Sequence, residues 1–519
     1  MRILCISYYN YAMQIQSILS TGSDGVIIDV ECHLSNGLPN IVIVGFASKA
    51  IEEAKERIRS AFASTKLLLP RKRITINLAP ADIPKDSTSF DLPIAVAILT
   101  AENQSAKLLS NTALIGELGL DGTIRPVRGI IGKLLVGRDK GLKTFYVPQK
   151  NLNQARMVPG ITVVGADNIK DLHAELFGST VLTKEHTEGG LYLKAKPCNS
   201  KDIPSFNEVV GQSRAKRALE IAAAGGHNVF MNGPPGTGKS MLAKAMATIL
   251  PPLSHEEMLT ITHLHSLATN DYESIVTARP FRAPHHSASH TSIIGGGQKI
   301  RPGEISLSHG GILFFDEFPE FPRTILEALR QPLEDSAITI ARAKESVTFP
   351  ANFTLIATAN PCPCGHYGTA KACQCLPYQI QQYRRKISGP ILDRIDIYTE
   401  VQEVEHKLLL QETPKGDDAS QIITRIAKAR DLQEKRYDSP TRRNADMNNR
   451  EVKSLAQLST SAKSVLDQAA VSLGISARSY MRTIKVARTI ADLGSQTEIL
   501  PDHISEALQY RSQAYATES

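Results

Sequence analysis

Residues 233–240 read GPPGTGKS, a glycine-rich stretch that ends in a lysine and a serine. This order matches the phosphate-binding loop (P-loop) G-x-x-x-x-G-K-[ST], and the apolar run Val229–Met231 and the helical pattern Met241–Ile249 flank it as such a loop requires. Backbone N–H groups then converge on a phosphate at a helix N-terminus, the lysine reaches the β- and γ-phosphates, and the hydroxyl binds Mg²⁺. The residues predicted to bind nucleotide are Gly233, Pro234, Pro235, Gly236, Thr237, Gly238, Lys239 and Ser240.

Polar residues also follow two further apolar runs. Residues 311–317 read GILFFDE, so Asp316 and Glu317 stand at the carboxyl end of a predicted strand, where α/β sheets bind ligands. We expect Asp316 to bind Mg²⁺ through water and Glu317 to orient or deprotonate the attacking water. Asn360 follows the run Phe353–Ala359 and could reach the γ-phosphate or that water, although an asparagine before a proline also begins turns.

Four of the seven cysteines form a tight cluster directly after Asn360. Four thiolates suit tetrahedral Zn²⁺ and leave no open position, which would make the metal structural. The spacing is C-x-C rather than the common C-x₂₋₄-C, so a metal-free loop is the alternative. The proposed ligands are Cys362, Cys364, Cys373 and Cys375.

Alternating strands and helices must position these groups. Residues 206–404 alternate between the two with glycine-rich turns, which indicates an α/β core with a parallel sheet. Residues 405–519 are mostly helical, residues 183–205 are polar and aperiodic, and the region before them is rich in strands. The clearest patterns are strands at Gly25–Glu31, Asn40–Gly45 and Arg73–Leu78, and helices at Ser48–Ser64, Ser420–Lys435 and Ala477–Leu493.

The composition is that of a globular protein. The chain has 519 residues, 42% hydrophobic and 21% charged, which excludes a disordered polyelectrolyte or a fibre. A net charge of +7 permits a nucleic-acid partner without requiring one. An odd cysteine number argues against a secreted disulfide framework. No apolar run reaches the roughly 18 residues of a membrane helix, and the first residues lack a signal-peptide core, so we expect a cytoplasmic protein without membrane association.

Several longer motifs give the chain a specific resemblance. The segments are FRAPHH at 281–286, GGG at 295–297, RPGEISL at 301–307, NPCPCG at 360–365 and SGPILDRID at 388–396. Together with the P-loop, the Asp-Glu pair and the strand-end asparagine of AAA+ ATPases, they resemble the YifB/ComM family, which is related to the ATPase subunit of magnesium chelatase. The match runs from about residue 25 to residue 508. The segment Val209–Gln212 resembles the AAA+ stretch that borders the adenine.

The resemblance implies a hexameric ring ATPase acting on DNA, because ComM proteins are associated with branch migration during natural transformation. Arg394 falls at the position of the arginine finger, which acts on a neighbouring subunit's ATP, although a salt bridge with Asp393 or Asp396 is the alternative. Arg478 resembles the sensor-2 arginine, and Arg482 is the other candidate. Chelatase-type insertion hairpins would face the pore, one within residues 259–302 and one at 338–347. The DNA-phosphate contacts expected there are Lys299, Arg301, Arg342 and Lys344.

Residues 85–89 and 116–131 resemble the Lon-protease domain, which shares the ribosomal S5-like fold. Ser89 aligns with the Lon nucleophile, but Ile131 stands where Lon has its catalytic lysine, and a serine nucleophile needs an adjacent base. We therefore expect no proteolysis, with Lys133 able to serve only in a shifted register. Ser89 is expected to be a helix N-cap.

These observations predict four segments and one activity. The segments are a Lon/S5-like α+β domain over residues 1–182, a linker over 183–205, an AAA+ core over 206–404 and a helical lid over 405–519. The predicted activity is ATP hydrolysis that drives a ring along single-stranded or branched DNA, with ATP, Mg²⁺ and a possible structural Zn²⁺. A chelatase-type metal-insertion motor and a protein-remodelling factor with an inactive protease-like domain stay open as alternatives.

Overall fold

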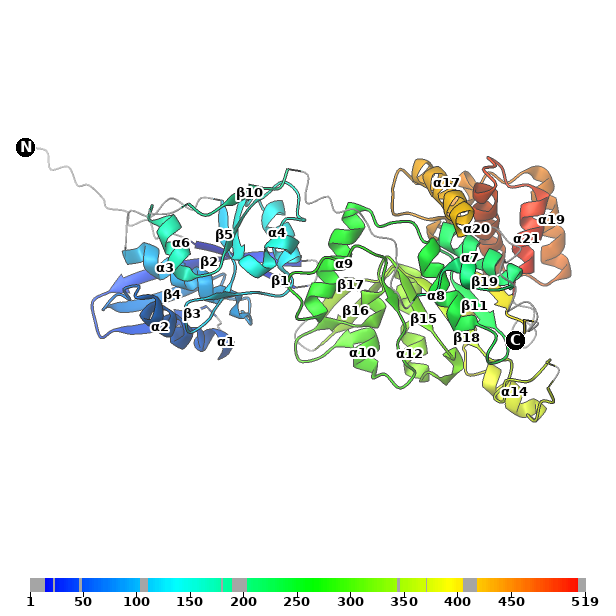
Figure 1. Cartoon of the computed structure of the whole chain (residues 1–519), viewed down its shortest axis with the longest axis horizontal. Coiled ribbons are helices and arrows are strands. Elements are labelled where there is room, and N and C mark those ends of the chain that lie inside the picture. Colours follow the sequence, from blue (N-terminus) through cyan, green and yellow to red (C-terminus); the bar gives the residue numbers. More distant parts are fainter. Residues whose placement is uncertain are drawn as a thin grey trace, which may run out of the picture. The chain divides into compact units, whose positions relative to one another are not determined.

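The described residues of the computed structural model form two compact units, one within residues 1–193 and 262–276 and the other within residues 194–261 and 277–519 (Figure 1). No described helix is both long and apolar enough to cross a membrane. The structure describes residues 15–21, 24–45, 49–102, 111–178, 181–188, 203–342, 346–369, 371–404 and 418–511.

An eight-stranded mixed sheet forms the N-terminal unit, in the order β10-β9-β8-β5-β1-β2-β4-β3. The alternation of apolar residues predicted its β4, where Ile74, Ile76 and Leu78 are buried. The predicted helix over 48–64 is divided into α1 (Lys49–Glu52) and α2 (Ala54–Thr65). The strands are β1 (Ile15–Thr21), β2 (Asp24–Ser35), β3 (Asn40–Val44), β4 (Arg73–Ala79), β5 (Thr112–Leu114), β8 (Thr144–Pro148), β9 (Thr162–Ala166) and β10 (Lys184–His186).

Helices of this unit complete its core. Every residue of α3 (Asp91–Glu102) from Asp91 to Thr100 is buried, as expected of a helix that is apolar all round. The others include α4 (Ile130–Asp139) and α6 (Ile169–Leu176). Strand β10 lies within the segment expected to be a linker and pairs antiparallel with β9.

The N-terminal unit also includes residues 262–276, which lie between the P-loop helix and the Asp-Glu strand in the sequence. This segment contains the second half of α9 (His255–Ala268). Gly132 packs so closely on His263 that an added Cβ would lie 2.5 Å from the ring, and an added Cβ at Gly129 would lie 2.6 Å from Leu267. Part of the stretch expected to hold an insertion hairpin therefore packs as a helix within the N-terminal unit.

The second unit contains a five-stranded parallel sheet in the order β12-β15-β18-β11-β19. Its central strands are mostly apolar because both faces are buried, which confirms the predicted α/β core. Helices α7 (Ser213–Gly225) and α8 (Lys239–Ile249) contribute to this core (Figure 1). The strands are β11 (Val229–Asn232), β12 (Phe281–Arg282), β15 (Ile312–Phe315), β18 (Thr354–Ala359) and β19 (Ile397–Glu400).

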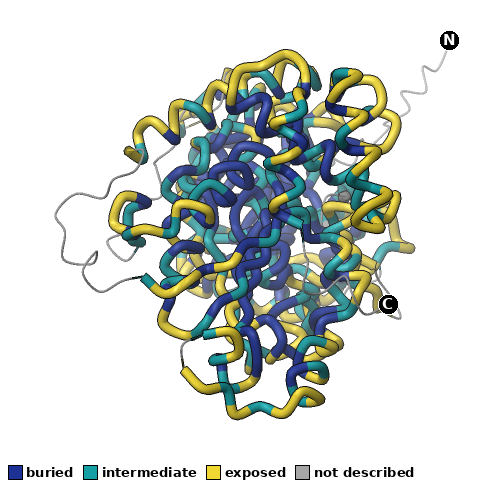
Figure 2. Tube along the Cα trace, turned by 90° about the vertical axis from the view of Figure 1, so that its right-hand side faces the viewer, coloured by how far each residue is buried: buried dark blue, intermediate teal, exposed yellow. Residues whose placement is uncertain are grey.

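Two hairpins and a helical region complete the second unit. The hairpins pair β13 (Gly295–Gly296) with β14 (Arg301–Pro302), and β16 (Ala337–Ala341) with β17 (Ser346–Pro350), which confirms the hairpin predicted at 338–347. Buried residues lie in the interior and exposed ones on the outer turns (Figure 2). The carboxyl-terminal part is helical as predicted, with α17 (Ala419–Tyr437), α18 (Asn449–Leu455), α19 (Thr460–Ser472), α20 (Ala477–Leu493) and α21 (Pro501–Gln509).

Candidate functional site

The P-loop connects the carboxyl end of β11 to the amino end of α8. Gly236 and Gly238 have φ angles of +80° and +87°, which residues with a Cβ rarely adopt. Gly233 lies so near the backbone of Val401 that an added Cβ would be 2.2 Å from its carbonyl oxygen. The glycines of the motif are therefore required by backbone conformation and by close packing.

Lys239 joins the P-loop to the end of the neighbouring strand. Its Nζ donates to the carbonyl oxygens of Gly233 (2.6 Å) and Pro234 (2.8 Å) and to Oδ1 of Asn360 (3.1 Å). Burial lowers the pKa of Lys239, and the nearby carboxylates of Asp316 and Glu317 oppose that shift. The structure thus places Asn360 at the lysine that would bind the β- and γ-phosphates.

The oxygens predicted to hold Mg²⁺ also lie together. Ser240 donates through Oγ to Oδ2 of Asp316 at 2.7 Å, so a hydroxyl and a carboxylate meet beside the P-loop. Hydroxyl and carboxylate oxygens are hard ligands of the kind that Mg²⁺ prefers. These two residues therefore fit the metal, and Glu317 follows directly at the same strand end.

Thr358 is a residue of this site that sequence reasoning missed. Its Oγ1 donates to Oδ1 of Asp316 (2.6 Å) and accepts the backbone N–H of Glu317 (3.0 Å). That bond holds Glu317 in a left-handed conformation with φ +53°. A hydroxyl near the carboxyl end of a mostly apolar strand was the available signal, but its partner depends on the pairing of β15 with β18.

Gln212 brings the segment Val209–Gln212 to the P-loop. Its Nε2 donates to the carbonyl oxygen of Thr237 at 3.5 Å and to that of Gln402 at 2.5 Å. This position beside the P-loop is the one expected of a segment that borders a nucleotide.

Arg394 and the P-loop lie at opposite ends of the strands of the parallel sheet. Ile397 and Glu400 of β19 pair in parallel with Val229 and Asn232 of β11, and the side chain of Asn228 donates to the carbonyl oxygen of Arg394. Arg394 is therefore beside the amino end of β11, whereas the P-loop follows the carboxyl end. The length of the strand, at about 3.3 Å per residue, separates the two by at least roughly 10 Å.

Two more arginines gather around Arg394. Its guanidinium pairs with Glu334, not with Asp393 or Asp396 as the alternative interpretation required, and this contact lowers the pKa of Glu334. Arg478 reaches the same Glu334 at 3.6 Å. Arg482 is held by Asp396 at 3.5 Å and by the carbonyl oxygen of Ile395 at 3.2 Å. Glu334 gave no signal in the sequence, because only the folded chain brings it to these arginines.

The two hairpins of the second unit lie against each other. An added Cβ at Gly295 would be 2.6 Å from Cδ1 of Ile340, and Nη1 of Arg342 donates to the carbonyl oxygen of Gln298 at 3.3 Å. Lys299, Arg301 and Arg342 are exposed, whereas Lys344 lies outside the described residues. The structure thus brings the described basic residues of two separate hairpins into one region.

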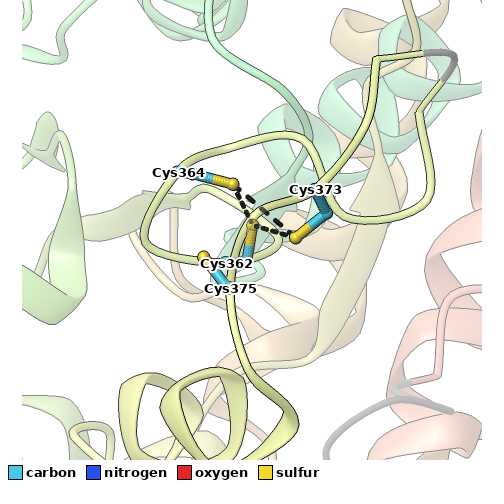
Figure 3. Close-up of side chains that lie close together, drawn as sticks. All are labelled: Cys362, Cys364, Cys373 and Cys375. Carbon is cyan, nitrogen blue, oxygen red and sulfur yellow. Dashed lines mark hydrogen bonds between the residues drawn. The ribbon is translucent and has the colours of Figure 1, made fainter.

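The four cysteines of the cluster point their sulfurs at one another (Figure 3). All four ligand atoms lie within 4.8 Å of one another, and three of the Sγ separations are 3.4, 3.6 and 3.7 Å. Zn–S bonds of about 2.3 Å in a tetrahedron place the sulfurs about 3.8 Å apart, so the cluster has the dimensions of a zinc site. The backbone N–H of Tyr367 donates to Sγ of Cys362, and hydrogen bonds from backbone groups of His366 and Gln374 lower the pKa of Cys364 to about 6.

Among the described residues, the side-chain hydrogen bond of the Lon-like serine goes to another serine and not to a base. Ser89 is buried, and its Oγ shares a hydrogen bond with Oγ of Ser87 at 2.8 Å. Burial lowers the pKa of Lys133 to about 8, but its Nζ donates to the carbonyl oxygen of Ile18 at 3.1 Å instead of to Ser89. The prediction that Ser89 is an N-cap is wrong: Ser87 is the cap and accepts the N–H of Ser89, which belongs to the short helix itself.

We therefore expect Ser89→Ala to change no catalytic activity. Wild-type chain should release no peptides from unfolded casein with or without ATP, because the hydroxyl is not activated. ATP hydrolysis by Ser89→Ala and by the matched variant Ser87→Ala should equal that of wild type. ATP-dependent casein cleavage that Ser89→Ala abolishes would contradict this interpretation.

Comparison with known proteins gives a consistent relationship along the chain. Family models described as magnesium chelatase subunit ChlI match residues 205–409, residues 30–151, and, for its C-terminal part, residues 416–511. The chain is 40% identical over 506 residues to competence protein ComM of Haemophilus influenzae, covering 96% of this chain and 97% of that protein. It is 40% identical over 487 residues to the uncharacterized protein YifB of Salmonella typhimurium, covering 93% and 94%.

A more distant similarity concerns Lon. Lon protease 2 of Herpetosiphon aurantiacus is 26% identical over 184 residues, which is 33% of this chain and 22% of that protein. With the parallel sheet, the P-loop and the helical carboxyl-terminal region, the similarity over nearly the whole length decides the relationship. The chain belongs to the ComM/YifB family of magnesium-chelatase-like AAA+ ATPases.

Proposed function

We propose that this protein forms a hexameric ring that hydrolyses ATP to move along single-stranded or branched DNA, and that it drives branch migration during recombination or natural transformation. The observation that carries the DNA part is the meeting of two basic hairpins at Arg342 and Gln298. The name competence protein, which the Haemophilus influenzae relative has, agrees with this role. Residues and geometry support the ATPase part independently of any DNA contact.

The geometry supports ATP hydrolysis as follows. Backbone N–H groups of the P-loop and Nζ of Lys239 would bind the phosphates, while Ser240 and Asp316 would hold Mg²⁺, which neutralises charge on the phosphates. Glu317 would orient or deprotonate the attacking water. Asn360, next to Lys239, would fix that water or the γ-phosphate at the correct position. Phosphoryl transfer depends mainly on such positioning and charge neutralisation.

The position of Arg394 supports a ring. It lies beside the amino end of β11, with the strand between it and the P-loop, and its guanidinium pairs with Glu334, which favours action on another subunit's nucleotide. A head-to-tail interface, which closes into a ring when the rotation permits, would bring it to the P-loop of a neighbour. Arg478 is about half exposed and shares Glu334 with Arg394, whereas Arg482 is held by Asp396. We therefore assign the sensor-2 role to Arg478 and propose that it acts on the same neighbouring site.

The hairpins support a DNA-binding pore. Lys299, Arg301 and Arg342 are exposed cations in one region of the second unit. Their charge would bind phosphates without sequence preference, which suits a translocating motor. Six copies would repeat this charge around one channel. Zn²⁺ at the four cysteines completes the proposed set of cofactors, with ATP and Mg²⁺.

The proposed function is tested by measuring ATP hydrolysis with single-stranded DNA, a four-way junction, unfolded protein or buffer, and strand exchange on a branched substrate. We expect both DNA substrates to stimulate hydrolysis, and Lys239→Ala to abolish both hydrolysis and exchange. Arg301→Glu combined with Arg342→Glu should weaken DNA binding by about tenfold and reduce its salt dependence, because phosphate contacts are lost.

Arg323→Glu is the matched control, because Arg323 is 83% exposed and lies outside both hairpins. It should retain wild-type stimulation. Stimulation by unfolded protein alone would favour a remodelling factor. Hydrolysis that DNA never alters, together with equal exchange by wild type and Lys239→Ala, would refute the proposed DNA motor and favour a chelatase-type motor.

A further inference from the structure

We infer that the four cysteines form a zinc site that positions the ATPase machinery, so that hydrolysis requires the bound metal. This inference rests on the ATP-hydrolysing part of the proposed function and does not depend on DNA. The segment from Cys362 to Cys375 is named the cysteine knuckle below. It connects the end of β18 to helix α14 (Pro377–Arg384).

The first ligand is joined directly to the ATP site. Cys362 is fully buried and follows Asn360 by two residues, with the buried Pro361 between them. Asn360 accepts the hydrogen bond from Nζ of Lys239. A metal that fixes the Cβ–Sγ direction of Cys362 also restricts the backbone of this short connection. The position of the Asn360 side chain therefore depends on the geometry of the knuckle.

A second contact joins the knuckle to the P-loop itself. Gly365 has φ +83° and packs on Pro235, where an added Cβ would be 2.7 Å from Cδ of the proline ring. The N–H of Gly365 donates to the carbonyl oxygen of Cys362 at 3.0 Å, which closes a turn around the metal ligands. The knuckle therefore packs on the P-loop at Pro235, a residue of the nucleotide-binding motif.

Helix α14, which follows the knuckle, leads to a contact with the loop that follows Glu317. Lys386, just after α14, pairs with Glu320 at 3.0 Å, and the N–H of Glu320 donates to the carbonyl oxygen of Glu317 at 2.8 Å. The knuckle therefore contacts the strand end of Asn360 and the P-loop, and Lys386 just after helix α14 contacts the Glu317 loop. These are the three elements that must be aligned for water to attack the γ-phosphate.

Few of the described residues of the knuckle are buried. Among its described residues, Cys362 and Gly365 are buried and the others are half-buried or exposed, so the segment lacks an apolar core. In such a segment the metal–thiolate bonds supply the stability that apolar burial supplies elsewhere. Four sulfurs at tetrahedral spacing suit Zn²⁺, and the closed ligand set makes the site structural.

The test uses the full-length chain and begins with its metal content. We expect one zinc per chain by elemental analysis, lost in Cys373→Ala, and retained both in Cys373→His, which supplies another zinc ligand, and in Cys32→Ser, which lies outside the cluster. Co²⁺ in place of zinc should give the visible bands of a tetrahedral thiolate site. Trypsin should cleave after the exposed Lys371 much faster in the metal-free protein.

The rate of ATP hydrolysis should depend on the bound zinc. Stripping zinc, or Cys373→Ala, should lower kcat for ATP by about 10- to 100-fold, the loss typical of small misplacements of reacting groups. Nucleotide binding should change less, and Zn²⁺ added to the stripped wild-type protein should restore kcat, which excludes irreversible misfolding. In an Asn360→Ala background the additional loss from Cys373→Ala should be smaller than in the wild-type background, because part of its effect acts through Asn360.

Three results would overturn the inference. These are a wild-type protein that neither contains nor takes up zinc, a metal-free protein with wild-type kcat, and losses from Cys373→Ala and Asn360→Ala that simply multiply. ATP hydrolysis that requires zinc but is not stimulated by DNA would refute the proposed DNA motor and leave the zinc inference intact. If the wild type hydrolysed no ATP, the proposed function would fail, while zinc content and Lys371 cleavage would still decide whether the metal shapes the knuckle.

Discussion

Replacing Glu317 by glutamine is expected to lower the rate of ATP hydrolysis at least about 100-fold while ATP still binds. The carboxylate stands at the carboxyl end of β15, beside the Asp316–Ser240 pair, and the Thr358 hydroxyl holds its backbone. Glutamine has the same shape but cannot accept a proton from water. The hydrogen bonds of Lys239, Ser240 and Asp316 do not involve this side chain, so the nucleotide should stay bound.

Single-turnover hydrolysis and equilibrium binding of a fluorescent ATP analogue separate these two effects. Lys239→Ala is the contrasting variant, because it should lose binding as well as hydrolysis. Glu256→Gln is the matched control, since Glu256 is an exposed carboxylate in the first turn of α9, and it should behave like wild type. A Glu317→Gln protein with near-normal turnover would show that another group activates the water.

The sequence predicted the parts of this site that are local in the chain. The P-loop, the Asp-Glu pair and Asn360 each follow an apolar strand, and parallel strands bring their carboxyl ends to one edge of a sheet. Residues that act through another strand were not predictable in the same way. Thr358 takes its role from the pairing of β15 with β18, and Glu334 from a fold that brings Arg394 and Arg478 together.

Errors and omissions elsewhere in the chain have physical causes of the same kind. Ser87, not Ser89, caps the short helix, because either serine can accept a backbone N–H and only the chain path decides which one is outside the helix. Residues 262–276 pack within the N-terminal unit on Gly129 and Gly132. Nothing in their helical spacing indicates which of the two units they join.

Mixing two inactive variants should restore ATP hydrolysis if the ring completes its sites between subunits. Lys239→Ala and Arg394→Ala should each retain less than about 1% of wild-type activity, since a lost arginine finger costs 10³–10⁵ in rate. In mixed rings, the intact P-loop of an Arg394→Ala subunit can face the intact arginine of a Lys239→Ala subunit. Random equal mixing makes about one quarter of the head-to-tail interfaces complete.

The control for this experiment is a mixture of Lys239→Ala with Asn360→Ala. Lys239 and Asn360 touch at 3.1 Å within one subunit, so every site in that mixture keeps a defect and hydrolysis should not recover. Arg478→Ala should complement Lys239→Ala as Arg394→Ala does, because Arg478 and Arg394 share Glu334 at the edge of the sheet opposite the P-loop. Failure to recover with Arg394→Ala would place the arginine in the same subunit as the ATP. Recovery with Asn360→Ala would contradict the placement of Lys239 and Asn360 in one site. Since the length of β11 separates Arg394 from the P-loop that follows it, we expect recovery when Lys239→Ala is mixed with either arginine variant and no recovery when it is mixed with Asn360→Ala.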